Sequence, residues 1–325
     1  MWIIFGWNDN NPDKEIYRTR FELYDDWMSN ITEPLYTFTI SIFHQADVSF
    51  QGSYIIISLF FLSILSFYIC KTCKYKSFVL ALILISVYAL IVVLFRMTYA
   101  ITFVLIGMYF FIHSKFSTRI KSLIMAIFIT LASLVHSMCI IYFLLFIPYF
   151  INKRNLKLCF FIYIPITFIL IGFIEHSLLP SIMNKMNLDQ KMDIFLGDTN
   201  NTQNKYIQYI LASLRVISVI ILPLGISYIA DKTKSIKIAP KDKKIIDINW
   251  FSLFIIPLLY ISHDLYRIMF ILVIIDFCMA SNYIRHRSIL LYTIVCACNI
   301  GYWFIWRPYF ENVFLAVFTS NLLYR

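Results

Sequence analysis

The chain is poor in charged residues, in glycine and in proline. Of its 325 residues only 14% are charged, 60% are hydrophobic, and there are 7 glycines and 9 prolines. A soluble domain has about 25% charged residues and about 45–50% apolar ones. The shortage of charge therefore excludes a soluble enzyme and a disordered chain, and the composition is not that of a fibrous protein.

The chain also lacks the motifs of several enzyme classes. It contains no GxGxxG, no phosphate-binding P-loop and no HExxH. Seven cysteines are present, including a CxxC at Cys70 and Cys73, but no second Cys/His pair follows at zinc spacing. We interpret all seven as packing thiols and expect neither a metal nor a cofactor. Residues 1–6 are too short for a signal peptide and resemble the end of a helix that begins upstream.

What the chain does contain is a succession of long apolar runs separated by short basic loops. This pattern is typical of an all-α, polytopic membrane protein. The runs cover 53–70, 78–112, 122–151, 158–174, 206–229, 250–281 and 288–306.

Three of these runs are too long for one crossing. A helix rises about 1.5 Å per residue and the hydrocarbon core is about 30 Å thick, so residues 78–112 would form a helix of roughly 50 Å. We expect 78–112, 122–151 and 250–281 each to fold back as a hairpin; a single, strongly tilted helix is the alternative for the first two, where no glycine or proline marks the turn. The turns then fall at Arg96, at His136 and at 263–267, and the chain has about ten transmembrane helices.

The distribution of charge gives this arrangement an orientation. With three hairpins, the basic loops all lie on one side and hold 17 Lys/Arg against three acids, whereas the other side holds ten Lys/Arg and fourteen acids. The positive-inside rule places the basic side in the cytoplasm. The prediction is a single membrane domain, 1–325, with the following parts: an extracytoplasmic segment 1–52, a helical core 53–306 with an external loop 175–205 and a cytoplasmic loop 231–249, and a tail 307–325.

Charged side chains inside apolar runs are candidates for function, because each costs about 2.5–3.5 kcal/mol to insert. Arg215 lies within its span, and Arg96, His136 and 263–267 lie at the outer ends of the hairpins. Arginines gathered near one interface suit a diphosphate, since a guanidinium pairs bidentately with phosphate oxygens and stays charged.

Each of these residues also has a structural interpretation. Arg96 would extend to lipid headgroups, and His136 would be a hydrogen-bonded core residue. Asp264 would pair with Arg267, three residues later, and Asp276 would belong to a local pair. The lysines of 231–249 indicate topology and contact with headgroups rather than a nucleic-acid site.

Several short motifs resemble one family. Residues 96–100 read Arg-Met-Thr-Tyr-Ala and residues 132–137 read Ala-Ser-Leu-Val-His-Ser, which is similar to an RxxxA and an A-x-x-x-H-S pattern of the EpsG-like and Wzy-type O-antigen polymerases. The resemblance covers residues 1–150, and beyond them only hydropathy and isolated arginines match. The opening external segment contributes Gly6-Trp7-Asn8, Asp13, Tyr17, Phe21 and Glu33-Pro34-Leu35-Tyr36.

This resemblance implies a GT-C-like glycosyltransferase of the bacterial inner membrane that acts without a metal. It would join undecaprenyl-diphosphate-linked repeat units of O antigen (lipopolysaccharide) or exopolysaccharide on the outer face, with a chain-length-regulating co-polymerase as a further partner and no nucleic acid. The candidate catalytic residues are His136 and Asp264. The candidate residues for binding the diphosphate or the sugars are Arg96, Arg215, Arg267, His263, Asp13 and Glu33.

Three other interpretations are weighed against the residues alone: a flippase or transporter, a membrane acyltransferase and a scaffold. A flippase or transporter would show internal repeats and charges near the midplane, and no repeat is evident. A membrane acyltransferase would use histidine as base with a nearby acid, and His136 has none within four residues. A membrane scaffold without activity would not need Arg215 inside a span.

Overall fold

The protein is described from a computed structural model, and every regular element in the described part is a helix. The described residues are 1–8, 14–23, 33–151, 158, 161–167, 169, 202–233, 237–260 and 263–283. The helices are α1 (Trp2–Gly6), α2 (Lys14–Glu22), α4 (Pro34–Gln45), α5 (Phe50–Thr72), α6 (Lys76–Ser86), α7 (Tyr88–Val93), α8 (Phe95–His113), α9 (Thr118–Val135), η1 (Ser137–Leu145), α10 (Phe146–Phe150), α14 (Thr202–Thr233), α15 (Pro240–Asn249), α16 (Phe251–Ile255), η3 (Ile256–Tyr260), η4 (His263–Met269) and α17 (Phe270–Ser281).

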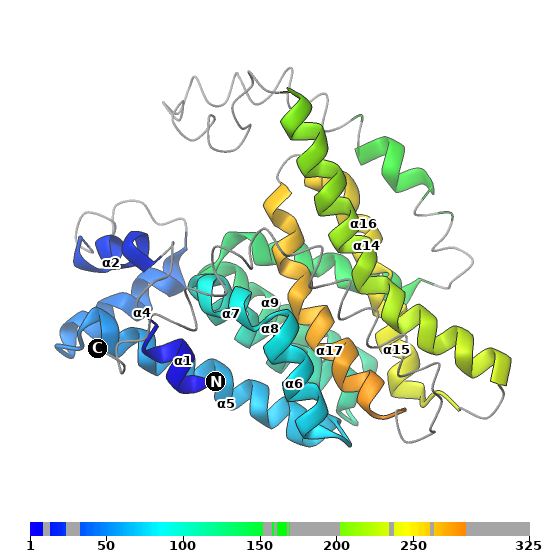
Figure 1. Ribbon diagram of the computed structural model, residues 1–325, viewed down its shortest axis with the longest axis horizontal. Coiled ribbons are helices and arrows are strands. Elements are labelled where there is room, and N and C mark those ends of the chain that lie inside the picture. Colours follow the sequence, from blue (N-terminus) through cyan, green and yellow to red (C-terminus); the bar gives the residue numbers. More distant parts are fainter. Residues whose placement is uncertain are drawn as a thin grey trace.

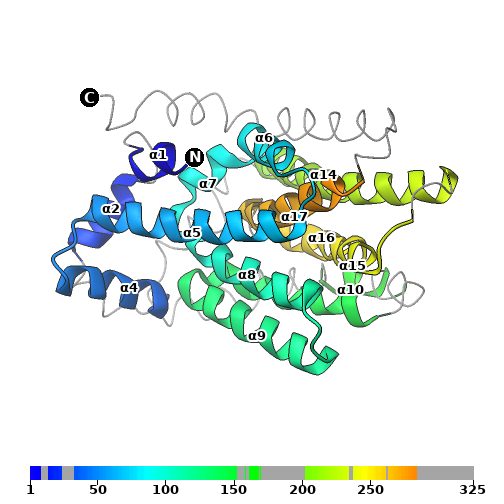
Figure 2. The same cartoon turned by 90° about the horizontal axis from the view of Figure 1, so that it is seen from below.

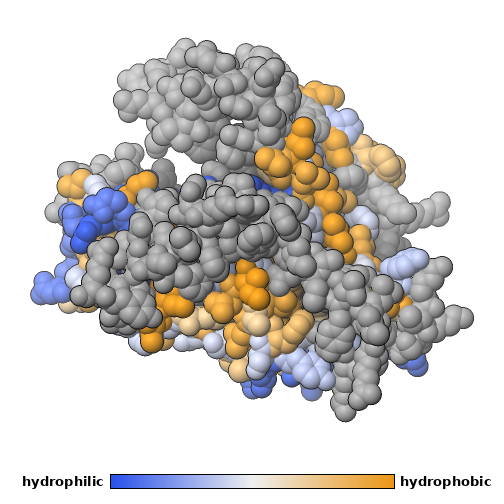
Figure 3. Space-filling model, in the orientation of Figure 1, coloured by the Kyte–Doolittle hydropathy of each residue, from blue (hydrophilic) through white to orange (hydrophobic). Residues whose placement is uncertain are grey.

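Four helices of the described part are long and apolar enough to cross a membrane: α5, α8, α9 and Tyr209–Ala230 of α14. They lie over the predicted runs, and α14 passes diagonally along one side of the molecule (Figure 1). Its outer face carries exposed aliphatic side chains, including Ile210, Leu214 and Ile221. In Figure 3 an apolar band follows this helix. A face of this kind is suited to lipid. The predicted span 288–306, the tail and all but the end of the loop 175–205 lie outside the described residues.

The first long run folds back as expected. The ring of Tyr54 near the start of α5 stacks on Phe95 at the start of α8, with centroids 4.0 Å apart, and Tyr68 near the end of α5 packs 6.2 Å from Tyr109 near the end of α8. The two helices thus run in the same direction, as Figure 2 shows, and α6 and α7 return the chain between them. The break falls at Leu94, two residues before the predicted turn.

The second long run also reverses, at His136. Met97 near the start of α8 contacts Cys139 of η1 (Sδ–Sγ 4.0 Å), and Phe111 near its end packs on Phe146 of α10, with ring centroids 5.7 Å apart. The segment after His136 therefore runs along α8, whereas α9 runs against it. Gly107 makes this close packing feasible, because a Cβ there would lie 2.9 Å from Met125 Sδ on α9.

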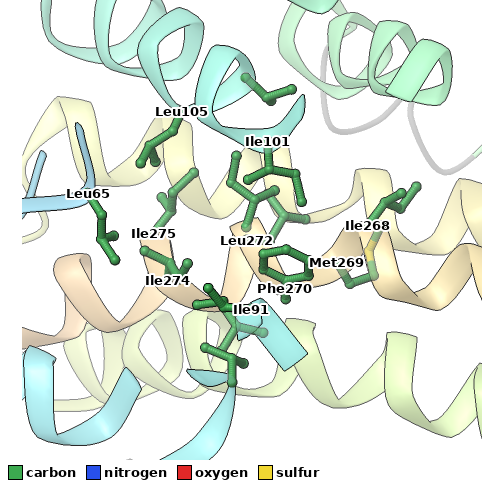
Figure 4. Close-up of a cluster of buried hydrophobic side chains, with 14 of the residues drawn as sticks. Leu65, Ile91, Ile101, Leu105, Ile268, Met269, Phe270, Leu272, Ile274 and Ile275 are labelled. Carbon is green, nitrogen blue, oxygen red and sulfur yellow. The ribbon is translucent and has the colours of Figure 1, made fainter. Parts of the chain in front are cut away.

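The third run folds back between η3 and α17 and forms the centre of the protein. Asn249 at the end of α15 donates to Asp276 of α17 (Nδ2–Oδ1 2.7 Å), so the two ends of the run meet. The partner of Asp276 is thus a neutral amide 27 residues earlier in the chain, rather than the local partner that was predicted. All twelve residues of α17 are buried, in agreement with a helix that is apolar all round, and Figure 4 shows α5, α7 and α8 contributing side chains to the surrounding core.

The basic loops gather at one end of this bundle. The backbone N–H of Lys74 donates to Asn282 Oδ1 (3.3 Å), and the Tyr283 hydroxyl donates to Asp242 (2.6 Å). The segments after α5, before α15 and after α17 therefore converge, as the predicted topology requires. The prediction that 231–249 is a loop was wrong for its second half. These residues form the helix α15, which has Pro240 at its first position.

Among the described residues of 1–52, the helices α1, α2 and α4 precede α5. Phe5 of α1 is fully buried against the rings of Tyr54 and Phe95. Lys14 fixes the start of α2, since its ammonium donates to Asn8 O (2.6 Å) and to Gln51 Oε1 (3.0 Å). This segment is therefore packed onto the start of α5, which is the end of the bundle opposite the basic loops.

Candidate functional site

Arg96 lies where the chain restarts as a helix. α7 ends at Val93, Leu94 departs from helical geometry (φ −84°, ψ 54°), and Arg96 is the second residue of α8. The Thr98 hydroxyl donates to Ile91 O (2.8 Å) and so satisfies a carbonyl that the break leaves without a helical partner. A cation at a helix N-terminus opposes the helix dipole, so this position favours a negatively charged partner beside Arg96.

Glu33 supplies that partner from a distant segment. It is the residue before α4, whose first position is Pro34, and its side chain does not cap its own helix. Instead Oε2 forms an ion pair with Nη1 of Arg96, and Oε1 accepts the backbone N–H of Ser137 (3.3 Å). One buried carboxylate therefore joins α4, the start of α8 and the turn after α9.

His136 forms the third part of the cluster. It ends α9 in an extended conformation (φ −146°, ψ 111°), its Nδ1 accepts Met138 N–H (3.4 Å), and the same nitrogen lies 3.7 Å from Glu33 Oε1. Burial lowers the pKa of His136 to about 3, and the charges of Arg96, Arg267 and Arg20 add to the effect. The imidazole is therefore neutral at physiological pH.

Two tyrosines enclose the Arg96 side chain. The guanidinium carbon lies 6.0 Å from the ring centroid of Tyr17 on α2 and 5.9 Å from that of Tyr36 on α4. Both tyrosines are buried, and Tyr17 also packs against Phe95. Cation–π contacts of this kind hold the guanidinium in place without consuming its hydrogen-bond donors. The Nε of Arg96 is buried and has no hydrogen-bond partner among the described residues.

Two further arginines lie near this cluster. Arg267 is on η4, where its charge acts on His136, and Arg215 is on α14. Arg267 belongs to η4, which η1 contacts through the Tyr142 hydroxyl and Ile268 O (2.5 Å). Arg215 is buried, and its guanidinium lies 4.4 Å from the ring centroid of Tyr266, the neighbour of Arg267. The structure thus brings Glu33, Arg96 and His136 together, with Arg267 near enough for its charge to act on His136, and it packs Arg215 on Tyr266 of η4.

Three predicted site residues cannot be placed at the level of side chains. His263 and Asp264 begin η4, the helix that carries Arg267, but their side chains lie outside the described part of the chain. Asp13 precedes α2 and also lies outside it. Within the described residues, no group of three metal-ligating side chains occurs.

Arg20 is the residue that sequence reasoning missed. It lies on α2 one turn after Tyr17, is half-buried, and its charge acts on Arg96, Glu33 and Tyr36. A charged residue in a polar segment is not unusual, so composition did not indicate a role for Arg20. The helical spacing of Lys14, Tyr17 and Phe21 could have indicated that one face of this segment packs against the protein.

Several guanidinium groups act on this cluster, an environment that suits an anion. Arg96 pairs with Glu33, the charge of Arg20 acts on Glu33 and His136, and the charge of Arg267 acts on His136. All of them lie at the start of α8, about 27 Å from its other end, where the basic loops gather. The arrangement can hold a multiply charged oxyanion and offers a neutral imidazole beside it.

The sequence as a whole matches the model of one protein family, described as the EpsG family, over residues 1–318. The chain belongs to the EpsG family. EpsG-like proteins resemble Wzy-type polymerases, and the match extends far beyond the residues 1–150 that carry the short motifs. No curated protein and no solved structure matches the chain. The family match and the four long apolar helices indicate a membrane protein similar to polysaccharide polymerases. The Glu33–Arg96–His136 cluster is its candidate active site.

Proposed function

We propose that this EpsG protein is a metal-independent glycosyltransferase that joins polyprenyl-diphosphate-linked repeat units into O antigen or exopolysaccharide. The observation that carries the proposal is the buried cluster of Glu33, Arg96 and His136, drawn from three segments and surrounded by further arginines. A glycosyl transfer from a lipid diphosphate needs cations for the diphosphate and an acceptor for a hydroxyl proton, and the cluster contains both.

In the proposed reaction, a hydroxyl of one repeat unit attacks the anomeric carbon of another. The bond between that carbon and the diphosphate oxygen breaks, and its electron pair stays on the diphosphate. Arg96 and Arg267 lower the barrier, because negative charge develops on the leaving oxygen and fixed guanidiniums stabilise it. Arg215 extends the same site along η4, and Asp13 and His263 contact the sugars.

His136 receives the proton of the attacking hydroxyl. In the structure Nδ1 accepts the Met138 N–H, so this role requires the other tautomer. In that tautomer Nδ1 gives up the Met138 N–H, carries the proton and donates to Glu33 Oε1, and Nε2 accepts. The present separation of 3.7 Å shortens when substrate excludes water, as catalytic hydrogen bonds commonly do. Glu33 then stabilises the imidazolium, and Asp264 is the alternative acceptor.

We further propose that the site faces outward in the bacterial inner membrane. The fold would be GT-C-like with ten crossings in one domain, 1–325. The ends of the bundle support this orientation, because the basic loops lie opposite the cluster. Undecaprenyl-diphosphate-linked units would enter from the lipid, and a chain-length-regulating co-polymerase would act on the same product.

Deletion of the gene tests the function. A polymerase predicts that lipid-linked single repeat units accumulate, because assembly and export continue while joining stops. The measurement is mass spectrometry of extracted lipid-linked glycans, with a complemented strain as control. An outer leaflet without lipid-linked units would indicate a flippase, and normal polymer lacking acyl groups would indicate an acyltransferase.

Labelling from outside the cell tests the orientation. Gln45→Cys lies at the end of α4 on the side of the site, and Lys115→Cys lies in the basic link between α8 and α9; both positions are exposed. In intact cells a membrane-impermeant maleimide is expected to label position 45 and not 115, with the exposed Cys70 replaced by Ser. Labelling of 115 alone would reverse the orientation, and labelling of both would contradict the two-ended arrangement.

A further inference from the structure

The helices α4 and α8 stay in contact for one turn beyond Arg96. Tyr99 follows Arg96 by three residues on α8, and Thr39 follows Tyr36 in the same way on α4, so each pair shares a helix face. Tyr36 contacts the Arg96 guanidinium, and the hydroxyl oxygens of Thr39 and Tyr99 are 3.1 Å apart. The Thr39 hydroxyl donates to Leu35 O (2.8 Å), so the Tyr99 hydroxyl is the donor between the two. The Tyr99 ring is therefore held in place one turn along α8 from the ion pair.

Two phenylalanine rings continue from Tyr99 to the surface. The centroid of the Phe60 ring on α5 lies 6.4 Å from that of Tyr99 and 6.2 Å from that of Phe103, and the rings of Tyr99 and Phe103 are 5.5 Å apart. We call Phe60, Tyr99 and Phe103 the aromatic patch. Tyr99 is buried, Phe103 is half-buried and Phe60 is exposed. Beside Phe60 on α5, Ile56 and Leu59 are exposed too, so the patch reaches a surface suited to lipid.

The aromatic patch lies further into the bundle than Arg96 does. The stacked rings of Tyr54 and Phe95 set α5 and α8 level with one another, and the two helices run in the same direction. Arg96 lies at that level, whereas Tyr99 is about 6 Å further along α8 and Phe60 about 9 Å further along α5. A lipid whose diphosphate is bound at Arg96 would extend its chain from that level into the hydrocarbon, which is the direction in which the patch lies.

We propose that the aromatic patch binds the first isoprene units of the polyprenyl chain of the donor. The proposal rests on the proposed function, which brings a lipid-linked diphosphate to Arg96. Isoprene units are branched and contain a planar double bond, and aromatic rings offer them large, rigid apolar surfaces. Within a membrane this contact is one of close packing, because the surrounding acyl chains are as apolar as the ligand. The patch therefore orients the chain and so directs the diphosphate toward Arg96.

Two exposed phenylalanines of α5 give a matched comparison. Phe60→Ala removes the outer ring of the patch. Phe67→Ala is the control, because Phe67 is also exposed, packs on Tyr109 of α8 (ring centroids 5.3 Å apart) and lies roughly 10 Å further along α5. Full-length protein is purified in nanodiscs. Its affinity for undecaprenyl diphosphate is measured by native mass spectrometry and its affinity for inorganic diphosphate by calorimetry.

The two ligands should respond differently to the substitution. Phe60→Ala is expected to weaken the binding of undecaprenyl diphosphate by about three- to tenfold, because packing contacts with the chain are lost. Its affinity for inorganic diphosphate should stay unchanged, since this ligand has no chain. Phe67→Ala should match the wild-type protein for both ligands. Wild-type affinity of Phe60→Ala for undecaprenyl diphosphate would overturn the proposal and leave the proposed function intact.

A crosslinking measurement keeps the test decisive if Phe60→Ala folds poorly. With p-benzoylphenylalanine in place of Phe60, the protein should crosslink to added undecaprenyl diphosphate, and excess inorganic diphosphate should suppress the product by displacing the head group. The same photoreactive group in place of Phe67 should give no product that inorganic diphosphate suppresses. A crosslink at position 60 to bulk phospholipid alone would overturn the proposal. Failure of the wild-type protein to bind undecaprenyl diphosphate at all would instead contradict the proposed function.

Discussion

Replacement of Arg96 with alanine is expected to reduce polymer formation by about 10²–10³-fold and to leave lipid-linked single units in the membrane. The change removes a cation that faces the donor and the partner of a buried carboxylate. Arg96→Lys should retain part of the activity, because a lysine keeps the charge but lacks the planar fork that binds an oxyanion with two parallel hydrogen bonds. Polymer length and lipid-linked glycans are measured in a deletion strain that carries each variant, with the protein level determined in parallel.

A second substitution separates binding from stability. Arg96→Ala leaves Glu33 buried without its ion pair, which costs about 3–5 kcal/mol and lowers the amount of protein. Arg96→Ala combined with Glu33→Gln removes that penalty, so the double variant should recover a normal protein level and still fail to polymerise. If the double variant polymerised normally, Arg96 would be only the structural partner of Glu33.

The sequence predicted where the chain reverses because length is a strong physical constraint. A run of apolar residues longer than the hydrocarbon core must tilt or turn, and each of the three long runs turns. The positions were less predictable. No glycine or proline marks Leu94 or His136, and the break at Leu94 depends on Thr98 satisfying Ile91 O, a contact that periodicity does not reveal.

The members of the cluster were predictable to different degrees. Arg96 and His136 are polar residues within apolar runs and stand out for that reason. Their connection through Glu33 was not predictable, because Glu33 is 63 residues from Arg96 and 104 from Ser137. Arg20 lies in a polar segment, where one more charge has no significance until α2 is placed over Phe95.

Arg215 shows the limit of reasoning from intramembrane charge alone. Its presence in a span suggested convergence with Arg96 and Arg267, but its guanidinium packs on the ring of Tyr266, and that contact stabilises the charge within the protein. Full polymer length in an Arg215→Ala variant would remove this residue from the proposed site.

The pH dependence of stability should report directly on His136. The pKa of this histidine is about 3 in the folded protein, below the ordinary value of 6.5, because of burial and the facing charges of Arg96, Arg267 and Arg20. As pH falls below 6.5, the unfolded chain binds a proton that the folded protein does not, so unfolding becomes easier. The stability is fully present above pH 6.5, and about 2 kcal/mol of it is lost by pH 5.

His136→Gln removes this proton. The melting temperature of the purified variant should therefore fall less between pH 7.5 and pH 5 than that of the wild-type protein, as measured by differential scanning fluorimetry in detergent. Glutamine can still accept the Met138 N–H, so the turn after α9 is expected to remain folded. An equal fall for both proteins would mean that His136 is protonated in the folded state and would contradict the description of a neutral imidazole among arginines.

The same variant decides whether the neutral imidazole acts in catalysis. Loss of a general base reduces a rate by about 10²–10⁴-fold, so at pH 7.5 His136→Gln should accumulate lipid-linked single units at a normal protein level. A purely structural His136 predicts nearly normal polymer, since the glutamine preserves the local hydrogen bond. If the variant is abundant and polymerises, His136 is a packing residue at the end of α9, and Asp264 at the start of η4 becomes the acceptor to test by Asp264→Asn.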